Sequence, residues 1–143
     1  MKLVPKMLVV TVALSAYNAY AGCGEGTTVF SCLTAKSKKI EVCDLGKTIK
    51  YSYGKTGNPE IVLKLPRSHV STSQWNGMGR YESYSVNIPN ADVVYEVFDS
   101  RDRHTEKREA GVNVEQNGNL LTTVNCKRNI KSQIIGINLK SSK

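Results

Sequence analysis

The sequence is poor in the residues that most often carry out chemistry or hold a metal ion. Its 143 residues include two histidines, His69 and His104, and one tryptophan, Trp75. No two of its four cysteines have the CxxC spacing typical of zinc sites, and both histidines lie far from them in the chain. The sequence therefore predicts no metal site and no cofactor.

Long apolar runs are also missing. The longest, from Met7 to Ala16, is about half of the ~20 residues that a helix needs to span a bilayer. Lys2 and Lys6 precede it, and the small triplet Ala19-Tyr20-Ala21 follows, which is the layout of a secretory signal peptide cleaved after Ala21. We therefore expect export to the periplasm or the cell exterior, and no transmembrane segment.

This cleavage site divides the chain into a signal peptide, 1–21, and a single domain, 22–143. A lipoprotein signal is the alternative, because Cys23 follows the small residues Ala21 and Gly22. Tyr20 favours the ordinary peptidase, since lipoprotein signals usually have an aliphatic residue three places before the cysteine. Cleavage removes two lysines and lowers the formal charge from +8 to +6.

A basic exported domain is expected to bind an acidic partner. Carboxylate-rich protein clefts and acidic polysaccharides are the partners that fit this destination. Nucleic acid is not expected, because the lysines and arginines are spread along the chain and the predicted location is outside the cytoplasm.

The cysteines predict two disulfides, because an even number in a small exported domain is typical of cross-linking. They are Cys23, Cys32, Cys43 and Cys126. A hairpin centred on residues 37–38 would set Cys32 opposite Cys43, whereas a last strand beside the first would set Cys32 near Cys126. Three pairings stay open; we favour a bond from the first or second strand to Cys126, since closing a loop of about ninety residues stabilises by about 4 kcal/mol.

The mature domain is expected to be all-β, a small antiparallel barrel or sandwich of about eight short strands. Short segments with alternating apolar and polar residues are separated by turn residues. The expected strands are 28–34, 39–43, 48–53, 60–65, 81–88, 93–98, 110–116 and 120–126. Asn117-Gly118 predicts a tight hairpin between the last two.

Alternation also predicts the buried faces. Ile49, Tyr51 and Tyr53 share one face of the third strand, as expected for a strand with one side in the core. The sixth strand, 93–98, is nearly continuous in apolar residues and is expected to be central and covered on both faces. Segments 66–80 and 99–109 are expected to be long loops, and apolar residues between 134 and 139 to form a final edge strand.

The segment from Trp75 to Tyr81 is the most suggestive of function. Its glycines would let the backbone bend around an exposed aromatic ring, and Trp, Tyr and Arg, here including Arg80, dominate interface energetics. Two interpretations stay open: a binding loop, or a turn in which Trp75 fills the core. No nucleophile with a base is recognisable, and the carboxylates of 99–109 alternate with cations, so the protein is not expected to be an enzyme.

The chain resembles the small periplasmic inhibitors of C-type lysozyme. The resemblance rests on Phe30-Ser31-Cys32, on the serine- and glycine-containing loop from Ser73 to Tyr81, and on Lys107-Arg108-Glu109-Ala110 before a strand pair ending in Cys126. It implies a barrel tied by a disulfide between its first and last strands, with Ser73 and Lys107 inserted into the lysozyme cleft. The family's Ser-Gly-Ala loop and Trp-x-Lys-Gly stretch are not found here.

The sequence therefore predicts an exported binding or inhibitor protein that blocks a cell-wall hydrolase of the lysozyme type through a basic aromatic loop. The candidate binding residues are Ser73, Trp75, Arg80, Tyr81 and Lys107. The alternative is an envelope-maintenance protein that binds an anionic surface polymer through its positive charge.

Overall fold

The computed structural model describes residues 22–142 and contains ten β-strands and one short 3₁₀ turn, η1 (Arg67–His69). The expected signal peptide, 1–21, lies outside the described residues. The strands are β1 (Thr27–Thr34), β2 (Lys39–Asp44), β3 (Thr48–Lys55), β4 (Asn58–Pro66), β5 (Ser71–Ser73), β6 (Tyr81–Asn90), β7 (Val93–Asp102), β8 (Arg108–Gln116), β9 (Asn119–Ser132) and β10 (Lys140–Ser141). The predicted all-β class is thus confirmed. Among the described residues, no helix has the length and apolar character needed to cross a bilayer.

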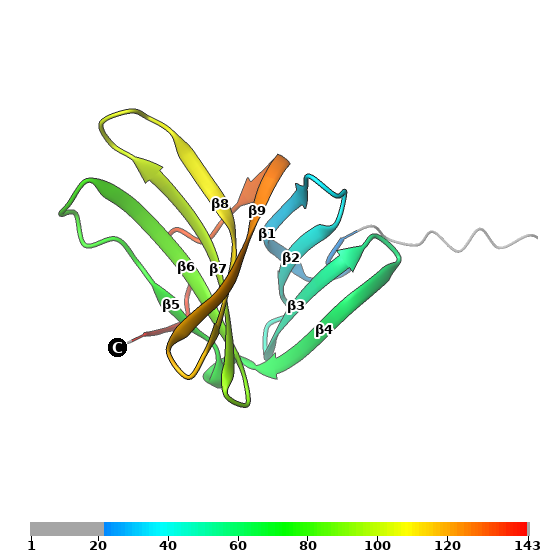
Figure 1. Ribbon diagram of the computed structural model, residues 1–143. Helices are drawn as coiled ribbons and strands as arrows, with labels where there is room; N and C mark the ends of the chain where they lie inside the picture. Colours follow the sequence, from blue (N-terminus) through cyan, green and yellow to red (C-terminus); the bar gives the residue numbers. More distant parts are fainter. Residues whose placement is uncertain (1–21, 143) are drawn as a thin grey trace, which may run out of the picture.

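The strands form one curled sheet, a half-barrel, in the order β10-β5-β6-β7-β8-β9-β1-β2-β3-β4. All neighbours are antiparallel except β10 and β5. We call β1–β4 the N-terminal half-sheet and β5–β8 the C-terminal half-sheet; the long strand β9 pairs with β8 along its first part and with β1 along its second (Figure 1). Register shifts between β1 and β9 mark bulges, which bend a sheet sharply.

The core lies between the inner faces of the two half-sheets. The rings of Tyr51 and Tyr95, from opposite half-sheets, have centroids 5.1 Å apart. The predicted inward alternation of Ile49 and Tyr51 is confirmed, since both are buried. The core residues are Val29, Phe30, Cys32, Ile40, Val42, Ile49, Tyr51, Val70, Val86, Ile88, Val97, Ala110, Val112 and Ile134.

The prediction that the sixth strand is covered on both faces was wrong. This strand, β7, is central in its half-sheet and buries Val97 on the inner face. On its outer face, however, Glu96 and Phe98 line an open trough. The half-barrel therefore has one core, and the outer face of β7 is left to solvent.

The two predicted long loops are also shorter than expected. Within 99–109, β7 continues to Asp102 and β8 begins at Arg108. The alternating charges pair across these strands, as Arg108 with Asp99 at 2.7 Å, so they support a hairpin and not a solvated loop. Within 66–80, η1 and β5 precede an irregular segment from residue 74.

The C-terminal tail differs from its prediction as well. The edge strand is β10, whereas residues 133–139 are irregular. Ile134 is fully buried, while Ile135 is 66% exposed. Ile134, with the partly buried Ile137 and Leu139, therefore packs in the core without pairing as a strand.

Both disulfides are present, joining Cys23 to Cys43 and Cys32 to Cys126. The favoured long-range bond to Cys126 is confirmed; it links β1 to β9 across 94 residues. The idea that a hairpin sets Cys32 opposite Cys43 was wrong, because the β1–β2 turn begins earlier and places Cys32 opposite Ile40.

Candidate functional site

One end of the C-terminal half-sheet brings together four of the five predicted binding residues. We call this end the tip; it consists of residues 74–81, which lead into β6, and residues 102–107, which join β7 to β8. The backbone N–H of Arg103 donates to the carbonyl of Arg80 at 3.0 Å. That of Asp102 donates to the carbonyl of Lys107 at 2.8 Å. The two segments therefore form one connected structure.

Trp75 belongs to the tip and does not fill the core. Its indole Nε1–H donates to the carbonyl of Met78 at 2.7 Å, and the Arg103 guanidinium lies over its ring, 5.0 Å from the centroid. Arg103 also donates through Nη1 to the carbonyl of Gly79 at 3.1 Å. Gly77 and Gly79 have φ values of 86° and 90°, which residues other than glycine rarely adopt. Of the two interpretations, the structure therefore favours an ordered loop.

An ion pair anchors the other side of the tip. Arg80 donates through Nε to both carboxylate oxygens of Asp102 at 3.0 Å, and that carboxylate also accepts the backbone N–H of His104 at 2.9 Å. The hydrogen bond from Arg80, chiefly, lowers the pKa of Asp102 well below its usual value. The Arg80 guanidinium lies 5.5 Å from the centroid of the Tyr81 ring. The guanidinium of Arg80 therefore makes its contacts within the tip and stabilises it.

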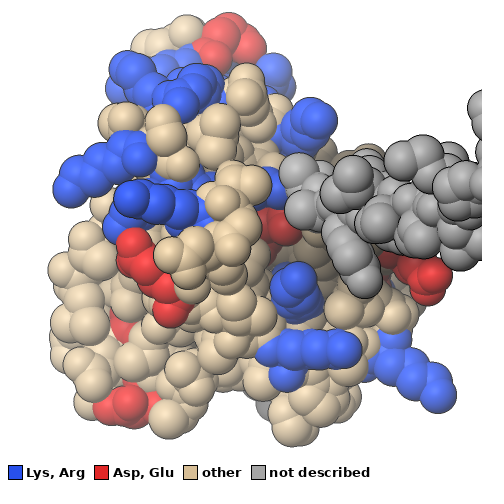
Figure 2. Space-filling model, turned by 90° about the vertical axis from the view of Figure 1, so that its right-hand side faces the viewer, with Lys and Arg blue, Asp and Glu red and all other residues tan. Residues whose placement is uncertain are grey.

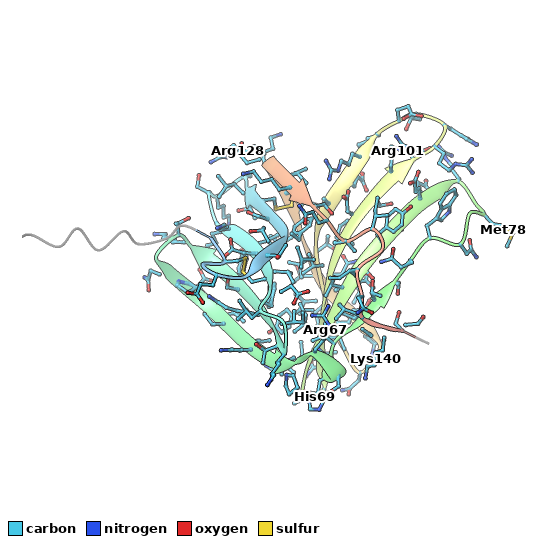
Figure 3. All side chains as sticks on the ribbon, turned by 180° about the vertical axis from the view of Figure 1, so that it is seen from behind. Arg67, His69, Met78, Arg101, Arg128 and Lys140 are labelled. Carbon is cyan, nitrogen blue, oxygen red and sulfur yellow. A yellow bond between two sulfur atoms is a disulfide. The ribbon has the colours of Figure 1, made fainter. Side chains whose placement is uncertain are left out.

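The surface of the tip is apolar for an exposed loop. Met78 is 71% exposed and Tyr81 is 58% exposed, whereas Trp75 is half-buried under the Arg103 guanidinium. Figure 3 shows Met78 projecting from the molecule at the far end from His69. Exposed apolar side chains on an ordered frame are typical of a protein-binding surface.

The tip is less basic than its sequence suggests. Arg80 pairs with Asp102, and Lys107 pairs with Glu109 at 3.1 Å. Among the residues that the structure describes, Arg103 is the one cation of the tip without an ion pair. The cations of the tip therefore leave it with little net charge, beside the exposed side chains of Met78 and Tyr81.

Ser73, the fifth candidate, lies beside the tip and faces a trough of about 540 Å³ on the outer face of the C-terminal half-sheet. Its hydroxyl hydrogen-bonds that of Ser142. The lining is mostly hydroxyl, amide and carboxylate groups: Ser73, Ser83, Tyr84, Ser85, Glu96, Phe98, Ser100, Glu109, Asn113, Thr123 and Asn125. A smaller hollow beside Tyr81 and Lys107 shares Ser100 and Glu109 with it, so trough and tip form a continuous surface.

Two carboxylates line the trough, and they come from positions that are well separated along the sheet. Glu96 lies opposite Asn113 on β8, and Asn113 is four residues from Glu109. At about 3.3 Å per residue the backbones of Glu96 and Glu109 are therefore ~13 Å apart. His69 and His104 are both exposed: His69 precedes β5, near the β6–β7 turn, whereas His104 lies in the β7–β8 turn at the tip.

The cluster closest to a metal-binding arrangement is Cys23, Glu41 and Cys43, whose ligand atoms lie within 4.8 Å of one another. Both sulfur atoms are joined in the Cys23–Cys43 disulfide. They therefore lack the thiolate form that binds zinc, and Glu41 pairs instead with Lys39.

Comparisons with protein-family models, curated proteins and solved structures find no match to this chain.

Sequence reasoning missed Met78, Arg103 and the trough around Phe98. In the sequence, Arg103 is one of several charged residues of alternating sign, and nothing there distinguishes it from its neighbours. Its position in the β7–β8 turn places it over Trp75. The alternation in Glu96, Phe98 and Ser100 was a usable signal for an outward face, but the apolar residues between them were more conspicuous.

Proposed function

We propose that this protein is an exported binding protein whose tip docks onto a partner protein. The observation that carries the proposal is the set of exposed apolar side chains, Met78 and Tyr81, held on a frame by the Arg80–Asp102 ion pair. Such a frame lowers the entropy lost on binding, because the loop is already ordered. Two disulfides in one small domain support an oxidising destination such as the periplasm.

A lysozyme of the C type is the first partner to test. Support comes from the resemblance to its inhibitors and from the Cys32–Cys126 bond, which ties the first strand to the last long strand, as that resemblance implies. Ser73 and Lys107, the residues that the resemblance would place in the lysozyme cleft, line the connected trough and hollow. Lys107 is the better placed of the two, since it is exposed at the tip itself.

The experiment measures hydrolysis of cell-wall substrate by a C-type lysozyme with increasing amounts of the mature protein. Wild-type protein is expected to inhibit, and a Met78→Ser, Tyr81→Ser double variant to inhibit at least about tenfold less, since buried anchors at an interface contribute ~2 kcal/mol or more. Leu121→Ser is the matched control. Leu121 is 57% exposed, but it lies in β9 by the β8–β9 turn, at the other end of the half-sheet.

Two results would contradict parts of this proposal. Absence of inhibition at micromolar concentration removes lysozyme as the partner. If, in addition, a pull-down from periplasmic extract recovers the same proteins with wild type and with the double variant, the tip is not the docking surface.

A further inference from the structure

The positive charge of the mature chain is divided unequally between the two half-sheets. Residues 22–66 and 127–132, which form the N-terminal half-sheet and the second part of β9, contain ten Lys and Arg and four Asp and Glu. Residues 67–126, which form the C-terminal half-sheet and the first part of β9, contain six Lys and Arg and eight Asp and Glu. The formal charges are therefore +6 and −2, so the basic character is local to one side.

Ion pairing sharpens this contrast. In the C-terminal half-sheet, Arg101 pairs with Glu82 at 3.1 Å and Arg108 pairs with Asp99 at 2.7 Å. In the N-terminal half-sheet Lys38 pairs with Glu60 and Lys39 with Glu41, but the lysines outnumber the carboxylates. Within residues 22–142, the lysines on or beside its outer face that make no ion pair include Lys50, Lys55, Lys64 and Lys131.

The register of the strands places these cations side by side. Lys50 of β3 lies directly opposite Lys64 of β4. Both point outward, because their neighbours Ile49, Tyr51 and Leu63 face the core. Like charges directly opposite each other in a sheet are destabilising, so a bound anion would relieve this repulsion. Figure 2, which views this side, shows Lys and Arg side chains at several places on it, with fewer Asp and Glu side chains among them.

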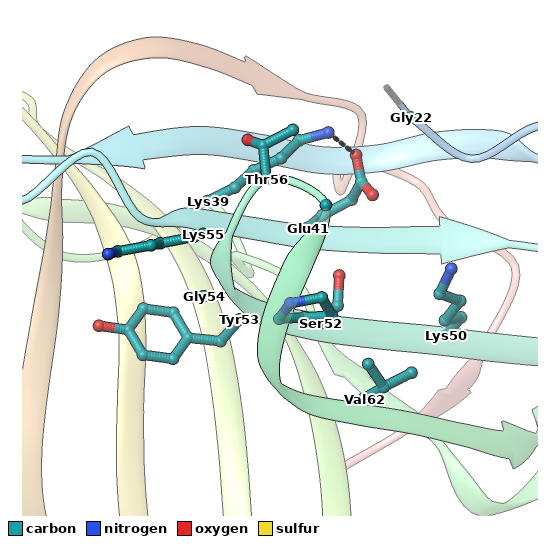
Figure 4. Close-up of a pocket in the computed structure, with 12 residues that line it drawn as sticks. Gly22, Lys39, Glu41, Lys50, Ser52, Tyr53, Gly54, Lys55, Thr56 and Val62 are labelled. Carbon is teal, nitrogen blue, oxygen red and sulfur yellow. Dashed lines mark ion pairs between the residues drawn. The ribbon is translucent and has the colours of Figure 1, made fainter. Parts of the chain in front are cut away.

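A hollow of about 180 Å³ lies within this face. Lys39, Lys50 and Lys55 border it, and Ser52 and Thr56 add hydroxyl groups (Figure 4). The one carboxylate that lines it belongs to Glu41, which is buried and paired with Lys39. The lysines that remain are free to bind a ligand.

We propose that the outer face of the N-terminal half-sheet is a binding site for a linear anionic polysaccharide. Successive carboxylates of the polymer lie against Lys50, Lys64 and Lys55, and sugar hydroxyls reach Ser52 and Thr56. This site is separate from the tip, and it goes beyond the proposed docking of a protein partner.

The spread of the charges argues for a polymer over a single small anion. Lys50 and Lys55 lie five residues apart on β3, and Lys64 lies on the neighbouring strand β4. At about 3.3 Å per residue these unpaired lysines cover ~16 Å of surface. The scarcity of exposed apolar groups argues against a membrane surface. Val62, 52% exposed, is the one large apolar side chain strongly exposed on the described part of this face, and interfacial binding normally buries an apolar face.

The test uses the full mature protein and polygalacturonate, a carboxylated linear polysaccharide, with binding measured by calorimetry at about 50 mM and about 500 mM salt. A Lys50→Gln, Lys64→Gln double variant is expected to bind about tenfold more weakly, at ~0.7 kcal/mol for each exposed charge contact. The control, Arg101→Gln with Arg108→Gln, removes the same formal charge from paired cations of the other half-sheet and should change the affinity less than about twofold.

Three outcomes would overturn the proposal. They are no binding of polygalacturonate by wild type, an equal loss in the control variant, and tighter binding to vesicles of anionic lipid or to single-stranded DNA than to the polysaccharide. Size-exclusion chromatography of each variant confirms that a loss of binding does not come from aggregation. Since the lysozyme assay depends on the tip, failure of one site leaves the other testable.

Discussion

The guanidinium of Arg103 lies over the indole ring of Trp75, with its central carbon 5.0 Å from the ring centroid. Trp75 comes from the segment that leads into β6, and Arg103 comes from the turn after β7. The same arginine donates to the carbonyl of Gly79. This side chain therefore links the two segments of the tip, together with the Arg80–Asp102 ion pair.

Replacing Arg103 with lysine is expected to loosen this junction. Lysine keeps the charge but lacks the planar group that stacks on the indole and reaches Gly79 at the same time. Trp75 fluorescence should shift to longer wavelength and become more accessible to iodide, while the free energy of unfolding falls by about 1 kcal/mol or less. Arg101→Lys is the control, because Arg101 pairs with carboxylates and not with the indole. An unchanged Trp75 spectrum in Arg103→Lys would show that the contact is not formed in solution.

The hairpins and the disulfides could be predicted because they depend on local signals. Asn117 and Gly118 have φ values of 51° and 78°, as the predicted tight turn requires. Cys126 bonds to Cys32 because β9 does lie beside β1. Turn chemistry is enough to predict the hairpin, and a cysteine count is enough to predict two disulfides. The pairing was only favoured from the sequence, because it depends on which strands are neighbours.

The sequence singled out the segment from Trp75 to Tyr81, but the contact of this segment with Arg103 and the two outer faces could not be predicted, because they depend on register between strands. Interleaved charges such as those from Asp99 to Glu109 suggest a loop until each is seen beside its partner across the sheet. The opposition of Lys50 and Lys64 likewise requires the β3–β4 register. The positions of the cations in the sequence suggested that they are spread out, whereas the structure leaves Lys50, Lys55 and Lys64 without ion pairs on one face.

The Arg80–Asp102 ion pair should persist into acid. Because Arg80 lowers the pKa of Asp102, the folded protein favours the ionised form of this side chain more than the unfolded chain does. The stabilisation that the ion pair gives to the folded protein is fully present above the ordinary aspartate pKa of about 3.9. It is lost as the pH falls through the lower pKa of the folded state. Carbon-13 NMR titration of Asp102 should give a midpoint below ~3.9, and Arg80→Gln should raise it. A midpoint at or above the ordinary value in wild type would contradict the pairing.

The two disulfides should contribute unequally to stability. Cys32–Cys126 closes a loop with a sequence separation of 94, and Cys23–Cys43 one of 20. By the loop-entropy relation, removing the first by paired alanine substitutions should lower the free energy of unfolding by about 4–5 kcal/mol, and removing the second by about 3 kcal/mol. Urea denaturation of the two variants measures the difference. Equal losses, or a larger loss for the shorter loop, would show that residual structure in the unfolded chain dominates.

Gly111 should be essential to the close approach of β8 and β9. A Cβ built at this position would lie 2.2 Å from the carbonyl oxygen of Val124, a backbone atom that cannot move aside alone. Gly111→Ala is therefore expected to lower the free energy of unfolding by about 1–3 kcal/mol, as overpacking does. Asn125→Ala is the control. Asn125 lies opposite Gly111 on β9, and its exposed side chain lines the trough on the outer face. Removing this side chain should change the free energy of unfolding by less than about 0.5 kcal/mol. Wild-type stability in Gly111→Ala would mean that the two strands are farther apart than described.

Ser132, near the end of β9, should be a residue whose removal stabilises the protein. Its Oγ is buried and has no hydrogen-bond partner among the described residues. A buried hydroxyl without a partner has lost its hydrogen bonds to water, at a cost of about 1–3 kcal/mol, and alanine removes that hydroxyl while leaving almost the same shape. Ser132→Ala should thus raise the free energy of unfolding by roughly 0.5–1 kcal/mol.

The contrasting substitution is Ser83→Ala, because the Ser83 and Ser100 hydroxyls are hydrogen-bonded at 2.7 Å. This variant should lose about 0.5–1 kcal/mol in the same urea assay. The opposite signs distinguish an unpaired hydroxyl from a paired one of the same type. If Ser132→Ala is instead destabilising, its hydroxyl must bond to a water in the adjoining cavity of about 400 Å³, which Tyr84 and Arg101 also line, since polar cavities of this size hold ordered water.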